Sequence, residues 1–387
     1  MHRHARHQSS FLAPFILASF CSFATSSMVS AASQFAISPL GSQSDSTNTV
    51  PSAINNSQTI IGWVFGDTPA DPAPFYLGAG PPAPFTPPPV NTAFSAQAMN
   101  ASGVVAGFFT PSIESTAPPS YSAALYQNGQ YVQLPSPDDN PMNDYRATGI
   151  NNLGQVVGYE QESDGLQRPI VWNNQQPTFL GAGGAANGIN DQGWVVGGIG
   201  AASGNTSIPV LWRDGTMTSI PMPANAISGT ALAVNNAGQV LVNYGGAEWL
   251  NGFFIWDNGV ETTLALSQDA MLLTYVTGMN DSGTVVGTSA YHAVYWVGGQ
   301  IYDLNDLIPA DSGWTLTSST GINDAGDIIG YGTFGGLDEP FLLSPTGFSG
   351  NIGSPEPTTL TLLTLATPLL LKRRSRRQFC TIQRGRS

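Results

Sequence analysis

Two groups of carboxylates, each accompanied by an arginine, stand out in the sequence: Asp138, Asp139 and Asp144 with Tyr145 and Arg146, and Glu160, Glu162 and Asp164 with Arg168. Carboxylates beside a planar aromatic side chain suit the binding of a cation such as calcium, or of a sugar. A pair of carboxylates is also the machinery of glycoside hydrolysis. The same residues equally fit solvated loops that keep an acidic protein soluble.

Other catalytic arrangements lack their residues. His292 is the only histidine after the first seven residues, and the two cysteines, Cys21 and Cys380, lie in terminal segments that we expect to be removed. Catalysis by Ser-His-Asp is thus limited to His292, and Cys-His pairs or multi-histidine metal sites cannot be assembled. We expect His292, which opens the segment YHAVYW, to be a packed or surface histidine. The sequence therefore predicts no catalytic residue and no cofactor, with calcium left open.

Three further aspartates occur in Asn-Asp-x-Gly segments, at Asp191, Asp281 and Asp324. These segments lack the alternating D-x-D-x-D pattern of calcium loops, and turn formation explains them more simply, although Asp324 with Asp327 is the best single candidate for a calcium site. Trp314, in the segment 306–318, lies outside the repeat pattern described next, which makes it a candidate for an exposed ligand contact.

A repeat organises the chain and must position these side chains. The pattern Ala/Gly-x-Asn-x-x-Gly-x-Val-Val-Gly occurs seven times with an asparagine spacing of 39 to 51 residues, at Asn55, Asn100, Asn151, Asn190, Asn235, Asn280 and Asn323. A period near 45 residues with β-rich content is typical of propeller blades. We therefore predict an all-β fold, a seven-bladed β-propeller of four-stranded repeats of about 45 residues.

Each repeat divides into four short strands. A tight Asn-(Asn/Asp)-x-Gly turn joins the first two, because asparagine bonds its own backbone and glycine accepts the positive φ. We expect a second glycine, seven residues after each asparagine, to let neighbouring blades approach. The third strands end in Tyr or Trp, which we expect in the core between blades. Loops between the second and third strands vary most in length, which favours them for binding.

The last repeat lacks a fourth strand. Gln34 to Leu40, with the sequence QFAISPL, resembles the fourth strand YVQLPSP of another repeat. We predict that this N-terminal strand completes the seventh blade and closes the ring, because closure removes an open sheet edge.

Charge limits the partners. Charged residues make up 10% of the chain, and between Gln34 and Pro357 there are 25 acidic residues but only Arg146, Arg168 and Arg213 on the basic side. Nucleic acid and anionic membrane surfaces are therefore excluded as expected partners.

Both ends are typical of processing signals. Residues 1–31 combine a basic start, an apolar run from Phe11 to Ala24 and small residues before a cleavage point, as in a secretory signal peptide. Residues 351–387 contain Pro355, Glu356 and Pro357, then an apolar stretch, then the basic cluster Lys372, Arg373, Arg374, Arg376 and Arg377. A simple tail anchor is the alternative interpretation.

This tail resembles the PEP-CTERM sorting signal. The resemblance implies cleavage near the motif by an exosortase, transient insertion in the inner membrane, and delivery to the outer surface or extracellular matrix of a Gram-negative bacterium. The domain prediction is thus a signal peptide at 1–31, a propeller at 32–350 and a sorting tail at 351–387.

The repeats resemble the HAF-type extracellular repeats and are similar in layout to kelch-like blades. The resemblance implies a secreted propeller and, by itself, no reaction. We expect a surface-displayed or released, non-catalytic protein that binds extracellular polysaccharide or another surface component. Two alternatives stay open: a polysaccharide-cleaving enzyme with paired carboxylates, and a structural spacer of the matrix.

Overall fold

The computed structural model describes residues 33–41, 49–64, 73–78, 83–89, 92–111, 121–138, 140, 142–200, 206–246, 251–267 and 274–347. The chain divides into two units, Met1–Gly347 and Phe348–Ser387, and all of the described residues belong to the first. The predicted signal peptide and sorting tail lie outside the described residues. No helix among those residues is long and apolar enough to span a membrane.

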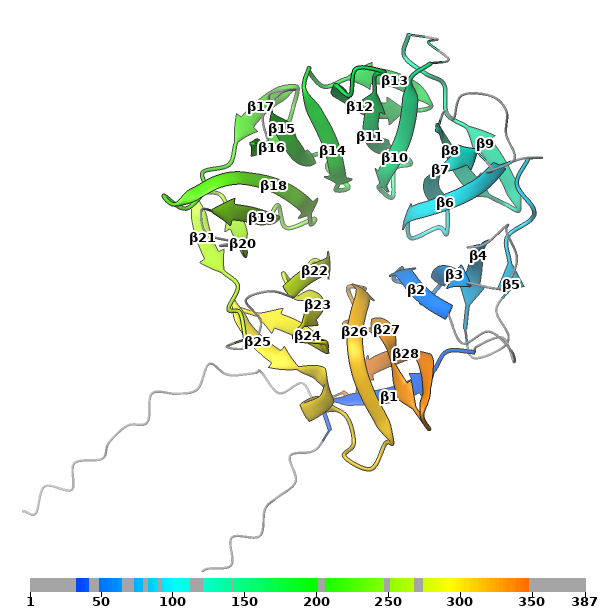
Figure 1. Cartoon of the computed structure of the whole chain (residues 1–387), viewed down its shortest axis with the longest axis vertical. Coiled ribbons are helices and arrows are strands. Elements are labelled where there is room, and N and C mark those ends of the chain that lie inside the picture. Colours follow the sequence, from blue (N-terminus) through cyan, green and yellow to red (C-terminus); the bar gives the residue numbers. More distant parts are fainter. Residues whose placement is uncertain are drawn as a thin grey trace, which may run out of the picture. The chain divides into compact units, whose positions relative to one another are not determined.

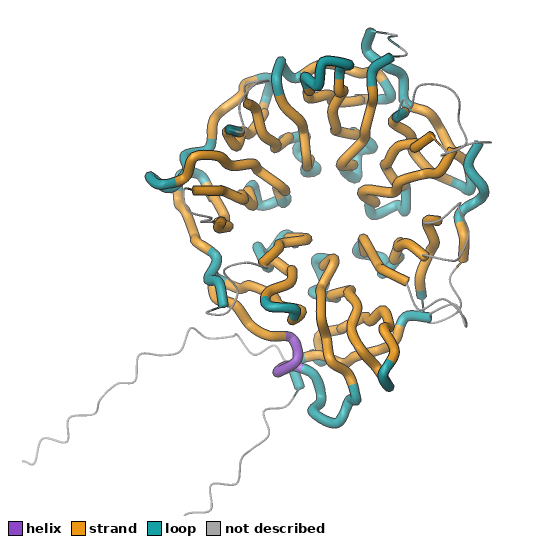
Figure 2. Tube along the Cα trace, viewed as in Figure 1, coloured by secondary structure: helices purple, strands orange, loops and turns teal. Residues whose placement is uncertain are grey.

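The described residues form seven four-stranded antiparallel sheets arranged as blades around a central axis (Figure 1). The prediction of a seven-bladed β-propeller is therefore confirmed. Figure 2 shows that strands make up nearly all of each blade, with loops at the ends of the blades.

Six blades are continuous in sequence, and their strands run from the inside of the ring outwards. Their bounds are β2 (Thr49–Ile54), β3 (Ile60–Val64), β4 (Ala73–Leu77) and β5 (Ala83–Pro84); β6 (Thr92–Met99), β7 (Val105–Pro111), β8 (Ser122–Gln127) and β9 (Gln130–Gln133); β10 (Asp144–Ile150), β11 (Val156–Gln161), β12 (Gln167–Asn173) and β13 (Gln176–Phe179); β14 (Gly184–Ile189), β15 (Val195–Gly200), β16 (Ser207–Arg213) and β17 (Thr216–Ser219); β18 (Ala226–Val234), β19 (Val240–Gly246), β20 (Asn251–Asp257) and β21 (Val260–Thr263); β22 (Thr274–Met279), β23 (Val285–Ser289), β24 (His292–Val297) and β25 (Gln300–Asp303).

The seventh blade joins the two ends of the described chain. It contains β26 (Trp314–Ile322), β27 (Ile328–Phe334) and β28 (Leu337–Pro345), and its outermost strand is β1 (Phe35–Pro39). β1 pairs antiparallel with β28, with Phe35 opposite Pro345 and Pro39 opposite Phe341. The predicted closure by the N-terminal strand is confirmed. A short 3-10 helix, η2 (Leu304–Leu307), precedes this blade.

The hydrophobic core lies between the blades. In blade three, Val156 packs towards blade two, whereas the next residue, Val157, packs towards blade four, because successive side chains of a strand point to opposite faces. Trp172 and Trp296 are almost completely buried, and their indole N–H groups donate to the carbonyls of Pro135 and Ala265 in the preceding blades, at 2.8 and 2.7 Å. The third-strand tryptophans therefore belong to the core between blades, as predicted.

The second glycine of the repeat has a different role from the one predicted. A Cβ atom at Gly158 would lie 1.9 Å from the carbonyl oxygen of Arg146, and one at Gly107 would lie 2.0 Å from that of Ser95. Both oxygens belong to the inner strand of the same blade, directly before a β-bulge. The glycine thus accommodates a bulge within its own blade, and the expectation that it lets neighbouring blades approach was wrong.

Closure of the ring gives a test by substitution in β1. Phe35 is buried against Tyr295, Leu316 and Phe341 of blades six and seven. We expect Phe35→Ala to lower the free energy of unfolding by about 3 kcal/mol, because truncation of a buried Phe leaves a cavity. Ser38→Ala, at an exposed position of the same strand, serves as the control and should change it by less than about 0.5 kcal/mol. Equal denaturation midpoints for the two variants would contradict the role of β1.

Candidate functional site

The topology sorts the connections onto two faces of the ring. Adjacent strands of a blade are antiparallel, so successive connections alternate between the two faces. The turns between first and second strands lie on one face, called here the first face. The loops between second and third strands lie on the other, the second face, together with the links from one blade to the next. All seven turns of the first kind contain five residues, whereas the loops of the second kind contain two to ten. Loop length therefore varies on the second face, which makes that face the more suitable place for a binding site.

The two acidic groups of the sequence meet on this second face, at the boundary of blades two and three. Asp138 lies in the link between β9 and β10, and Glu162 directly follows β11. Arg168, on β12, joins them: its Nη2 lies 2.9 Å from Asp138 and its Nε lies 2.9 Å from Glu162. The expectation that these loops share a face is confirmed.

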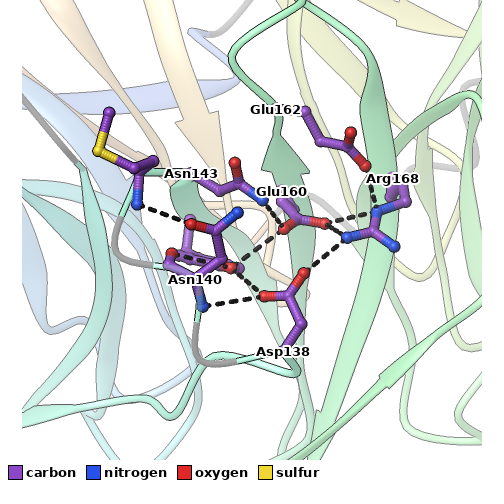
Figure 3. Close-up of polar contacts among 8 residues, drawn as sticks. Asp138, Asn140, Asn143, Glu160, Glu162 and Arg168 are labelled. Atoms are coloured by element: carbon purple, nitrogen blue, oxygen red, sulfur yellow. Dashed lines mark hydrogen bonds and ion pairs between the residues drawn. The ribbon is translucent and has the colours of Figure 1, made fainter.

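Glu160 is the centre of the network (Figure 3). Its side chain is completely buried, and it accepts hydrogen bonds from Asn143 Nδ2 at 2.5 Å, Tyr145 OH at 3.0 Å and Arg168 Nε at 2.6 Å. A buried carboxylate is costly unless it is paired and fully hydrogen-bonded, and here both conditions hold. Glu160 therefore fixes the positions of Asn143 and Tyr145.

Asp138 extends the network towards solvent. Arg168 Nη2 donates to Asp138 at 2.9 Å, and the single hydroxyl proton of Tyr145 is shared between Asp138, at 2.6 Å, and Glu160, at 3.0 Å. Partial burial raises the pKa of Asp138, but the hydrogen bonds from Tyr145, the backbone N–H of Asn140 and Arg168 outweigh it, so the pKa lies below the ordinary value. Burial, followed by the hydrogen bonds to Asp138 and Glu160, raises the pKa of Tyr145 well above the ordinary range. The network thus holds an ionised Asp138 beside a neutral Tyr145.

A hollow of about 680 Å³ adjoins this network. Its volume is within the range of small-ligand sites. Its wall combines apolar side chains with hydroxyls and amides, namely Ser122, Ala123, Gln133, Leu134, Pro135, Ser136, Asn140, Asn143, Tyr145 and Gln175. Asn143 and Tyr145 belong to this wall and also donate hydrogen bonds to Glu160. The buried carboxylate therefore positions one side of the hollow. The sequence reasoning included Tyr145 and Glu160 but missed Asn143 and the hollow.

The other residues of the two acidic groups lie elsewhere. Asp144 and Arg146 flank Tyr145 on β10 and point to the opposite face of the strand, where Arg146 stacks over the ring of Tyr121 at 4.0 Å. Asp144 accepts from the backbone N–H of Tyr121 at 3.0 Å. Asp164 accepts from the backbone of its own turn at Leu166. Asp144 and Arg146 thus join β10 to the segment before β8, and Asp164 stabilises its own turn. None of the three lines the hollow, and Asp139 lies outside the described residues.

Trp314 does not have the exposed position predicted for it. It begins the inner strand β26 of blade seven rather than lying in a loop, and it is half-buried. Its ring stacks on Phe334, with centroids 4.9 Å apart, and meets Phe341 edge-on. The sequence interpretation failed because it assigned residues 306–318 to a loop, whereas β26, like β18, begins nine residues before its repeat asparagine. His292, in contrast, is exposed and bonds Asp303, as expected for a surface histidine.

The repeat asparagines form a closed ring on the first face. The Oδ1 of each accepts backbone N–H groups of its own turn, for example those of Gln192 and Trp194 at Asn190. The Nδ2 of each donates to the backbone carbonyl of the next repeat asparagine, and the circuit closes from Asn323 to Asn55, at 2.9 to 3.3 Å throughout. The turn was predicted; the bond between blades was not.

The predicted turn geometry is confirmed within this ring. The glycines three residues after the asparagines have φ between 77° and 85° in blades three, four, five and seven, and Gln58 takes the same left-handed conformation in blade one. Asp327, part of the best calcium candidate, accepts amide N–H groups from Asn323 and Gln58 at 2.9 and 2.8 Å. In the part of the chain that the structure describes, no group of three His, Cys, Asp or Glu residues is arranged to hold a metal ion.

Comparison with known proteins supports the fold alone. No family model matches the chain, and no curated protein matches it. Among solved structures, a prolyl endopeptidase has a TM-score of 0.51 at 10% identity, over 78% of this chain and 51% of the other. TolB from Acinetobacter baumannii has a TM-score of 0.41 at 10% identity, over 77% and 63%, and the SapL1 lectin 0.32 at 11% identity, over 78% and 96%. The chain therefore spans less than two thirds of the first two.

The asparagine ring predicts that replacing one repeat asparagine by aspartate lowers the stability of the fold. Asn190→Asp keeps the Oδ1 acceptor but removes the donor to the Asn235 carbonyl and brings a charge to that oxygen. We expect the free energy of unfolding to fall by about 2 kcal/mol, because a buried carbonyl loses its partner. Asn258→Asp, in an exposed turn of left-handed φ, is the matched control and should be nearly neutral. A small effect at Asn190 would show that the blades do not depend on this bond.

The ionised state of Asp138 predicts a dependence on pH. Because the folded-state pKa lies below 3.8, its contribution is complete above pH 3.8 and is lost as the pH falls through the folded-state pKa. We expect wild type to exceed Asp138→Asn in unfolding free energy by less than about 1 kcal/mol at pH 6, since Asp138 is partly exposed. The difference should shrink in urea unfolding curves as the pH falls below 3.8 and through the folded-state pKa. A difference that grows on acidification would have the wrong sign.

Proposed function

We propose that this chain is an exported, non-catalytic binding protein for extracellular polysaccharide, and that the hollow at the boundary of blades two and three is its binding site. The observation that carries the proposal is the wall of the hollow, in which Asn143 and Tyr145 are fixed by the buried Glu160. Planar amides and hydroxyls pair with sugar hydroxyls, while the exposed Pro135 offers apolar contact to the C–H face of a sugar ring.

The state of the carboxylates supports binding over hydrolysis. A glycosidase needs a general acid that is protonated at working pH, hence a carboxyl group of raised pKa. The pKa of Asp138 is lowered instead. Glu160 is enclosed by Asn143, Tyr145 and Arg168 and has no exposed surface with which to reach a glycosidic bond. The contacts of Asp138 and Glu160 thus favour a role in positioning neighbouring side chains over a role in hydrolysis.

The terminal segments support the location. Residues 1–31 have the pattern of a signal peptide, and 351–387 resemble a PEP-CTERM tail that an exosortase would process. We further propose that the chain belongs among the HAF-type repeat proteins on the strength of its seven repeats. Display at the bacterial surface or in the matrix would bring the second face of the ring to polysaccharide.

A direct test uses the purified chain with a panel of bacterial polysaccharides, measuring binding by calorimetry and new reducing ends by a colorimetric assay. We expect binding without shortened products. Gln133→Ala removes an exposed amide from the hollow and should weaken binding up to about tenfold, the value of one hydrogen bond. Gln300→Ala, an exposed glutamine of blade six, is the control and should leave binding unchanged.

Each other outcome has a defined meaning. New reducing ends would overturn the non-catalytic assignment. Binding that is insensitive to Gln133→Ala would place the site elsewhere. Absence of binding to every member of the panel would overturn the proposal in favour of a structural spacer.

A further inference from the structure

We propose that the hollow selects glycans that carry free amino groups, such as de-N-acetylated hexosamine chains, over neutral and over acidic glycans. This inference rests on the proposed function and names its substrate class. Three observations support it. Within the described part of the chain, the wall of the hollow has no cationic side chain, and the side-chain oxygen of Asn143 in that wall has no hydrogen-bond partner. The carboxylates beside the wall outnumber the one arginine that pairs with them.

The described residues that form the wall of the hollow include no cationic residue that could bind an acidic sugar. The described part of the chain contains three arginines and no lysine. Arg168 is bound by Asp138, Glu160 and Glu162, and Arg146 is stacked on Tyr121 beside Asp144. Arg213 lies over the ring of Trp194, 4.9 Å from its centroid. A uronic acid chain in the hollow would therefore meet neighbouring carboxylates and no guanidinium of the wall, which costs binding free energy through repulsion.

The wall offers an acceptor that the protein leaves unused. Asn143 is 95% buried, and its Nδ2 is committed to Glu160. Because a carboxylate only accepts hydrogen bonds, this contact fixes the orientation of the amide, and Oδ1 is the atom left for a ligand. No hydrogen bond within the described residues uses that oxygen, and Figure 3 shows it without a contact. This oxygen is therefore available as an acceptor in the wall of the hollow, and an ammonium group can donate to it.

The charge beside the wall is not balanced. Asp138, Glu160 and Glu162 together bring three negative charges against one positive charge of Arg168. Asp138 is the outermost of these, with about a third of its side chain exposed, and it bonds Tyr145 of the wall. An amino group of the ligand would reduce this excess, whereas a hydroxyl or an acetamido group would not.

The test compares three hexasaccharides of equal length by calorimetry with the full chain: hexaglucosamine, its fully N-acetylated form, and hexagalacturonate. We expect the affinity to fall in this order. Asp138→Asn keeps the acceptor for Tyr145 but removes the charge, and should weaken hexaglucosamine binding about three- to fivefold, as for a partly exposed ion pair. Because Asp138 also bonds Tyr145 of the wall, binding of the N-acetylated form should fall as well, but by less than that of hexaglucosamine.

Asp214→Asn is the matched control against non-specific attraction between a polycation and an acidic protein. Asp214 is exposed on the opposite face, in a turn where other blades have asparagine, so the variant loses the same charge at a distance. Equal losses in the two variants would overturn the inference.

The further outcomes separate this inference from the proposed function. Equal affinity for the aminated and N-acetylated forms, with both sensitive to Gln133→Ala, would overturn the selection for amines and leave the glycan site in place. Preference for hexagalacturonate would also overturn it. Absence of binding to all three, together with failure of the polysaccharide panel, would overturn both.

Discussion

The hydrogen bond from one repeat asparagine to the backbone carbonyl of the next is the interaction on which the architecture depends. Each side chain uses its oxygen to shape its own turn and its nitrogen to set the distance to the neighbouring blade. Because these amides are buried, every unmade bond would carry a desolvation cost, so the seven turns are constrained together. All seven consequently have five residues, while the loops on the other face are free to differ. One face of the ring thus carries the contacts that join the blades, and the loops of the other face are free of that constraint.

Much of the fold could be predicted because its signals are local and repeated. The asparagine–glycine turns, the strand order and the closing strand follow from turn chemistry, alternation and an unpaired edge. The misinterpreted residues depend on register and on contacts between strands. Gly158 faces the Arg146 carbonyl only because a bulge follows Ala147. Trp314 stacks on Phe334 because β26 extends further than the sequence pattern indicates.

The candidate site was predictable in part for the same reason. The topology placed the two acidic segments on one face, and Arg168 does connect them. The sequence could not distinguish Tyr145, which faces the hollow, from Arg146, which faces Tyr121, without the register of β10. Nothing in the sequence marks Asn143 as a site residue, because its role depends on the hydrogen bond to the buried Glu160, which only the folded structure brings beside it. The residue types alone excluded Cys-His catalysis and multi-histidine metal sites. Which side chains line the hollow could be determined only from the packed structure.

The pairing of β1 with β28 also governs the order in which the molecule becomes complete. β1 is made first, yet its partner is the last strand of the propeller to be made. Throughout synthesis the growing stack of blades has an unpaired strand at its advancing end, and the first strand has no sheet to join. Contacts between residues so distant in sequence form slowly, because the intervening chain must first be closed into a loop. Ring closure therefore has to wait for β28, and until then an incomplete ring exposes unpaired sheet edges with which another copy of the chain can pair.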